Sequence, residues 1–162
     1  MQFQIREANR NDINTIYDFI KGLAIYEKLE NEFIATHSDL ETTIFDQKYA
    51  NVLIGNEIDE IGNETPVCFA LYFYNYSTFL AKPGIYLEDL FVIPEKRSKG
   101  YGTKMLKELV KIAISKNCGR VEWSVLNWNS PAIKVYEGIG ANPQSEWTVY
   151  RLTESEMINF TK

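Results

Sequence analysis

Two adjacent carboxylates, Glu88 and Asp89, interrupt an apolar run from Ile85 to Ile93 that ends at Pro94. The β-branched, aromatic and aliphatic residues of this run predict a strand that is covered on both faces. A buried carboxylate is costly unless it has a partner or a task, and burial raises its pKa, which suits a general base near neutral pH. Strand alternation would send the two acids to opposite faces, so they need not share one role. The alternative is a strand that opens here, with both acids in water.

A basic turn follows the strand and has the sequence Arg-Ser-Lys-Gly-Tyr-Gly, residues 97–102. Gly100 and Gly102 allow positive φ and a close approach of a ligand to the backbone. The free N–H groups of the next helix and its dipole would make a phosphate site, to which Arg97 and Lys99 add positive charge. The spacing fits neither the nucleotide P-loop nor the dinucleotide motif, because the turn lacks a G-x-x-x-x-G-K-[ST] run and a third glycine.

The elements that must position this stretch are predicted from periodicity and turn residues. The order is strand, two helices, three strands, helix, strand, helix and strand, with the last strand over Trp147–Leu152. Residues 56–66 are predicted to be a surface loop, and residues 120–126 a strand. This order predicts a mixed sheet with helices on both faces rather than a doubly wound parallel sheet. We expect one domain over residues 1–162.

Composition narrows the class of partner. The 162 residues carry 22 acidic against 17 basic side chains, a net charge of −5, which argues against a general nucleic-acid binder and is compatible with a cationic substrate. Cys68 and Cys118 show no metal-ligand spacing, and His37, the single histidine, has no cluster around it, so no metal is expected. No signal segment or membrane span is recognisable, which predicts a cytoplasmic protein without a membrane partner.

The turn and the strand before it carry a resemblance to a known family. Arg97-x-x-Gly100-x-Gly102 resembles the pyrophosphate-binding motif of the GNAT superfamily of acetyl-coenzyme A dependent N-acetyltransferases. Tyr-Leu-Glu-Asp-Leu-Phe-Val, residues 86–92, resembles the diamine (spermidine/spermine) and thialysine N-acetyltransferase branch. The likeness runs over nearly the whole chain. It implies an α+β fold with a mixed, mostly antiparallel sheet of about six to seven strands, in which the fourth and fifth splay apart around acetyl-coenzyme A.

The resemblance also implies roles for single residues. Glu88 would be the general base, through an ordered water, and Tyr136 the acid for the departing thiolate. Coenzyme A would be bound by Phe91, Val92, Arg97, Lys99, Gly100, Tyr101, Gly102, Thr103 and Asn129. The amine would be bound by Glu27, Asp89, Tyr26 and Phe79. Plain structural readings stay open beside these: a core tyrosine for Tyr136, a solvated helix end for Glu27 and an aromatic plug over the core for Phe79.

The implied reaction is acetyl transfer to a primary amine of a diamine, polyamine or lysine-like amino acid, in a homodimer whose subunits line each other's sites. Two alternatives remain. One is another GNAT activity, on a protein lysine or a protein N-terminus. The other is a non-catalytic coenzyme A binding module, which would bind the cofactor and turn over no amine.

Overall fold

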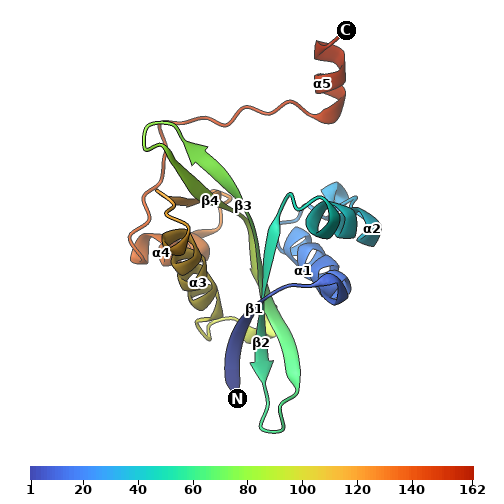
Figure 1. Ribbon diagram of the computed structural model, residues 1–162, viewed down its shortest axis with the longest axis vertical. Coiled ribbons are helices and arrows are strands. Elements are labelled where there is room, and N and C mark those ends of the chain that lie inside the picture. The colour runs from blue at the N-terminus through green and yellow to red at the C-terminus, as the bar shows by residue number, and fades with distance from the viewer. The chain divides into compact units, whose positions relative to one another are not determined.

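Five strands form one sheet in the order β1-β2-β3-β4-β5, within a unit that spans residues 1–124. The computed structural model describes residues 1–162 (Figure 1). The strands are β1 (Gln2–Glu7), β2 (Asn51–Ile58), β3 (Glu64–Ser77), β4 (Lys82–Val92) and β5 (Val121–Trp123). The first three pairings are antiparallel and the β4–β5 pairing is parallel. The predicted mixed, mostly antiparallel sheet is therefore confirmed.

The predicted number of strands, six to seven, is wrong, because the sheet has five. No strand forms over residues 147–152, where Trp147, Val149, Tyr150 and Leu152 are all exposed. The strand predicted over 120–126 shortens to β5, which has three residues. Apolar alternation alone does not make a strand, which also needs a neighbouring strand to pair with, and the five-stranded sheet does not include residues 147–152.

Helices cover both faces of the sheet (Figure 1). On one face α1 (Ile13–Tyr26) packs Ile16 and Phe19 against Phe69 of β3 and Phe91 of β4. On the other face α3 (Tyr101–Ser115) buries an apolar stripe of Met105, Leu106, Leu109 and Ala113. The remaining short elements are η1 (Arg10–Asp12), η2 (Glu30–Glu32), α2 (His37–Leu40), the π-helix η3 (Glu41–Asp46) and η4 (Pro94–Lys96).

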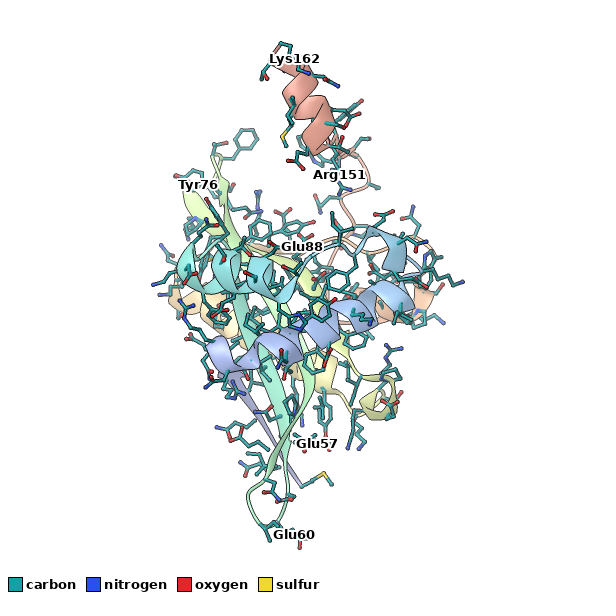
Figure 2. The ribbon with its side chains drawn as sticks, turned by 90° about the vertical axis from the view of Figure 1, so that its right-hand side faces the viewer. Glu57, Glu60, Tyr76, Glu88, Arg151 and Lys162 are labelled. Carbon is teal, nitrogen blue, oxygen red and sulfur yellow. The ribbon has the colours of Figure 1, made fainter.

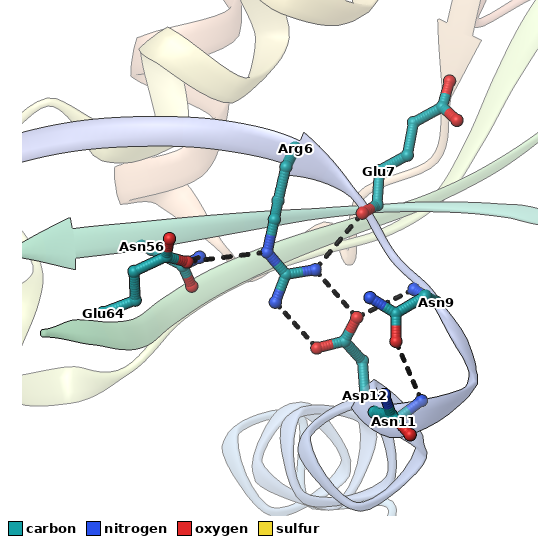
Figure 3. A network of polar contacts seen from close by, with 7 residues as sticks. All are labelled: Arg6, Glu7, Asn9, Asn11, Asp12, Asn56 and Glu64. Atoms are coloured by element: carbon teal, nitrogen blue, oxygen red, sulfur yellow. Dashed lines mark hydrogen bonds and ion pairs between the residues drawn. The ribbon is translucent and has the colours of Figure 1, made fainter.

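A polar network fastens the β2–β3 hairpin to the start of α1 (Figure 3). Arg6 of β1 donates two hydrogen bonds of 2.8 Å to the carboxylate of Asp12, which lowers the pKa of Asp12. The Arg6 Nε also lies 3.7 Å from Glu64, and Glu64 accepts a 2.7 Å hydrogen bond from Asn56 of β2. Both strands of the hairpin are thereby linked to Arg6 of β1.

Residues 125–162 form a second unit with two helices, α4 (Ser130–Gly138) and α5 (Glu154–Phe160). Thr153 caps α5 in a reciprocal capping box with Glu156. Thr36 and Asp39 make the same arrangement at α2. No helix of the chain combines the length and the apolar content needed to cross a membrane.

Candidate active site

β4 carries a bulge at Glu88. Leu71 of β3 pairs with Asp89, and the next residue, Tyr72, pairs with Leu87, so Glu88 has no partner on β3. A bulge resets the alternation of the strand that carries it. Leu87 and Asp89 therefore face opposite sides of the sheet, although they are two residues apart. The expectation that both acids are covered is wrong for Glu88, which is exposed.

Asp89 lies on the α1 side of the sheet and is partly buried. Burial, together with the negative charges of Glu88 and Glu27, raises the pKa of its carboxyl to about 7. Glu27 itself is the C-terminal cap of α1, and partial burial raises its pKa as well. The structure thus brings together three acids, and for Glu27 and Asp89 the surroundings disfavour the charged form. A cation placed among them would favour the charged form of each.

Arg97 connects the basic turn to the C-terminal end of α1 and to β4. Its guanidinium lies 4.5 Å from the centre of the Tyr26 ring and 5.6 Å from that of Phe91. Its Nε donates a 3.0 Å hydrogen bond to the backbone oxygen of Val92. Stacking on aromatic faces and a hydrogen bond to a carbonyl fix the plane of the guanidinium. Arg97 thereby connects the basic turn to Tyr26, the residue that precedes Glu27 in the sequence.

The edge of β4 that faces β5 is unpaired beyond Leu87. β5 pairs only with residues 85–87, so the C-terminal half of β4 has no neighbour on that side within the sheet. Ile93 donates its N–H to Val67 of β3, at 3.0 Å. Alternation of hydrogen bonds then turns the N–H of Phe91 toward β3 and that of Val92 toward the free edge. Phe91 and Val92 are both expected to bind coenzyme A, and Val92 is the one whose backbone N–H points to the free edge of β4.

The turn after β4 leaves space in front of the N-terminus of α3. Gly100 adopts φ 77°, a left-handed conformation, and is the N-cap of the helix without a side-chain cap. A Cβ built on Gly100 meets no atom within 4 Å, and one built on Gly102 meets only Val92, at 3.9 Å. The first intrahelical bond runs from Lys104 N to Gly100 O, at 3.0 Å, so the N–H groups of residues 101–103 have no partner within the helix. Open space and free donors fit a pyrophosphate group.

The two glycines therefore do different things. Both glycines allow positive φ, and only Gly100 adopts it. Gly102 lies inside the first turn of α3, where its missing side chain leaves the helix N-terminus uncovered. Ser98 supplies the second left-handed residue of the turn, with φ 62°.

Sequence reasoning missed Glu57, which it placed in a surface loop over residues 56–66. β2 continues to Ile58, and Glu57 is buried beneath the basic turn. Its carboxylate accepts hydrogen bonds from the side chains of Lys96, Lys99 and Tyr101. These partners lower its pKa to about 2. The only signal in the sequence was an acid two residues beyond an apolar strand, together with a basic run elsewhere in the chain that could pair with it.

Phe79 is not brought near the acids of β4 within this chain. It lies in the turn between β3 and β4 and is fully exposed. Lys82, where β4 begins, precedes Asp89 by seven residues, about 23 Å of extended strand.

Asn129 and Tyr136 belong to the second unit. Asn129 is the N-cap of α4, and its side-chain oxygen accepts from the backbone N–H of Ala132 at 3.4 Å. Pro131 occupies the first turn of the helix. Tyr136 lies near the C-terminal end of the same helix.

Known proteins resemble this chain in sequence and in fold. Residues 22–141 match the Acetyltransferase (GNAT) family. The thialysine N-epsilon-acetyltransferase of Bos taurus is 32% identical over 160 residues, which cover 94% of each chain. The L-ornithine N5-acetyltransferase NATA1 of Arabidopsis thaliana is 30% identical over 191 residues, covering 93% of this chain and 84% of that protein. The solved structure of the V. cholerae integron cassette protein VCH_CASS6 has a TM-score of 0.80 and 26% identity, over 100% of this chain and 99% of its own.

The family match covers β4 with its bulge, the glycine turn and α4, which are the elements that carry the predicted chemistry. The chain therefore belongs to the GNAT acetyltransferase family, whose members use acetyl-coenzyme A as cosubstrate.

Proposed function

We propose that the chain transfers an acetyl group from acetyl-coenzyme A to a primary amine of a diamine, a polyamine or a lysine-like amino acid. The observation that carries the proposal is the acidic group of Glu27, Glu88 and Asp89, which suits a small cation carrying more than one charge. Relatives named for thialysine and ornithine acetylation support a substrate of this size and charge.

An alkyl ammonium has a pKa near ~10, so the reacting amine arrives protonated and must lose a proton before it attacks. Glu88 is the proposed base, because it is exposed at the bulge and can receive that proton through an ordered water. Asp89 and Glu27 would hold the second ammonium group. Because the pKa of Asp89 is about 7, this carboxyl gains charge when the cation arrives, which strengthens the contact.

Acetyl-coenzyme A, when bound, would supply the acetyl group as a thioester. Gly100, Gly102 and Thr103 would hold its pyrophosphate through backbone N–H groups, and Asn129 is proposed to contact it from the start of α4. The Val92 N–H would polarise the carbonyl oxygen. The Tyr136 hydroxyl would give its proton to the leaving sulfur. The side chains of Arg97, Lys99 and Tyr101 are proposed to support the turn, since each already contacts residues of this chain.

Thiol release from acetyl-coenzyme A tests the proposal across putrescine, spermidine, spermine, lysine, thialysine and ornithine, beside a panel of lysine and N-terminal peptides. Turnover on a diamine or polyamine is expected if the acids line a cation site. Turnover confined to peptides would favour a protein acetyltransferase. Coenzyme A binding with no turnover on any amine would favour a non-catalytic module.

A homodimer is the proposed assembly. Four apolar residues near the C-terminus are exposed: Trp147, Val149, Tyr150 and Leu152. Phe79, in the turn between β3 and β4, is exposed as well. Exposed apolar side chains of this kind suit an interface with a second copy of the chain. Sedimentation velocity checks this: a Trp147→Asp, Tyr150→Asp double variant should sediment as a monomer at a concentration where the native protein is a dimer. A native protein that stays monomeric at all concentrations removes the assembly.

A further inference from the structure

One buried carboxylate contacts three side chains in and beside the basic turn. Glu57 of β2 accepts a 2.7 Å hydrogen bond from the Tyr101 hydroxyl, lies 3.4 Å from the Lys99 Nζ and pairs with Lys96. The three partners come from the six residues 96–101, which include Gly100. No other acid of the chain is buried so deeply and contacts so many side chains of one short segment.

The turn needs such a hold, because its backbone is unfavourable by itself. Ser98 and Gly100 both adopt left-handed φ, 62° and 77°. A non-glycine residue in that conformation costs about 1–3 kcal/mol and persists only where its surroundings fix it. Lys96 and Lys99 flank Ser98, and Tyr101 follows Gly100, so the contacts to Glu57 lie on both sides of the two left-handed residues, of which Ser98 is the strained one.

Glu57 is itself held in place by neighbouring strands. Glu57 sits on a β2 strand that the Arg6 network ties to β1 (Figures 2 and 3). The Tyr101 ring stacks on Phe3 of β1, with centres 4.3 Å apart. Lys104, in the first turn of α3, lies 5.2 Å from the Phe3 ring centre. Glu57 thus couples a fixed strand to the segment whose N–H groups face the open space before α3.

We propose that Glu57 is a positioning residue of the coenzyme A pyrophosphate site, and that it acts by holding residues 96–101 in the conformation that presents the free backbone N–H groups at the start of α3. The inference rests on the coenzyme A half of the proposed function and on nothing about the amine.

Charge alone predicts the opposite effect of losing Glu57. Removing a negative group beside an anion site, and releasing two lysines from it, should strengthen the attraction for pyrophosphate. Holding the turn predicts weaker binding, because the donors would no longer be fixed before the ligand arrives. The sign of the change in affinity therefore separates the two accounts.

Isothermal titration of coenzyme A into Glu57→Gln measures that sign. We expect the Kd to rise at least about fivefold, the KM for acetyl-coenzyme A to rise with it, and kcat at saturation to stay within about twofold. The matched control is Glu60→Gln, an exposed acid in the loop of the same hairpin, which should bind within about twofold of the native protein (Figure 2). Unchanged or tighter binding by Glu57→Gln overturns the proposal, even if its melting temperature falls.

Tyr101→Phe provides a second test if Glu57→Gln does not fold. The change removes the hydroxyl that reaches Glu57 and keeps the ring on Phe3. We expect a two- to fivefold rise in Kd, and a Glu57→Gln, Tyr101→Phe double variant no weaker than Glu57→Gln alone, because both changes break one contact. A Tyr101→Phe protein with native affinity, or losses that add in full, would show that Glu57 does not act through this contact.

The titrations with coenzyme A test the role of Glu57 independently of whether the protein acetylates an amine. A native protein that binds coenzyme A and acetylates no amine defeats the proposed reaction while the Glu57 comparison can still be read from the titrations. A native protein that binds no coenzyme A at millimolar concentration overturns both.

Discussion

Glu27, at the C-terminal end of α1, and Asp89, beside the bulge of β4, are electrostatic neighbours: charge on Glu27 helps to raise the pKa of the Asp89 carboxyl to about 7. Neither residue has a cationic partner in the chain that would offset this cost. Acids held together in partial burial are a stability cost that a cationic ligand relieves. The relationship links the fold to the kind of substrate that it suits.

Asp89→Asn should stabilise the protein at high pH. Because the folded state raises the pKa of Asp89 from 3.8 to about 7, it binds the proton more tightly than the unfolded chain. The free energy of unfolding therefore falls as pH rises from about 4 to about 7 and stays low above that window. Removing the group should raise it at pH 8 by up to about 4 kcal/mol, and by little at pH 4. Urea unfolding at both pH values measures this, with the exposed Glu30→Gln as control; equal effects at the two pH values would contradict the assignment.

Glu27→Gln should raise the KM for a diamine several-fold while the KM for a monoamine of equal chain length changes little. The reason is that Glu27 is proposed to face the second ammonium rather than the reacting one. Steady-state kinetics with cadaverine and pentylamine supply the comparison. Glu30→Gln, an exposed acid three residues further on, is the matched control. Equal changes for both amines would remove Glu27 from the distal site.

Glu88→Gln should lower kcat/KM most at low pH. At high pH a growing fraction of the amine is already unprotonated and needs less help from a base, so the loss should shrink there. A rate profile from pH 6 to 10 against the native enzyme gives the comparison. The same factor of loss at every pH would point to binding or folding instead of proton transfer.

Gly100→Ala should weaken coenzyme A binding beyond what its effect on folding explains. A Cβ at φ 77° strains the backbone by about 1–2 kcal/mol, and here it would also project into the space before α3. Gly62→Ala is the matched control, because Gly62 has φ 88°, equally open surroundings and a position in the distant β2–β3 loop. Both variants should lose similar stability in thermal melts, and only Gly100→Ala should lose affinity. Equal affinities would mean that no ligand occupies that space.

Tyr136→Phe should lower kcat at least about tenfold and leave the Kd for coenzyme A within about twofold. The change removes the hydroxyl proposed as the proton donor and preserves the ring. Single-turnover rates and titration of coenzyme A separate the two quantities. A phenylalanine variant with native turnover would make Tyr136 a structural residue of α4.

Much of the frame could be predicted from the sequence. Pro94, the glycines and the amphipathic pattern after them located β4, the turn and α3, because these signals are local and depend on backbone chemistry. The capping boxes at Thr36 and Thr153 were predictable for the same reason. The strand predicted over 147–152 failed because alternation describes a strand's faces and says nothing about whether an edge is free to receive it.

By itself the sequence determined the family motif, the mixed sheet and the presence of two acids in the strand before the glycine turn. Only the tertiary structure decided which acid is which: the bulge at Glu88 leaves that side chain exposed and turns Asp89 toward α1 and Glu27. It also decided that Glu57 belongs to the turn. Register and burial depend on contacts between residues far apart in the chain, and one extra residue in a strand exchanges the faces of everything that follows it.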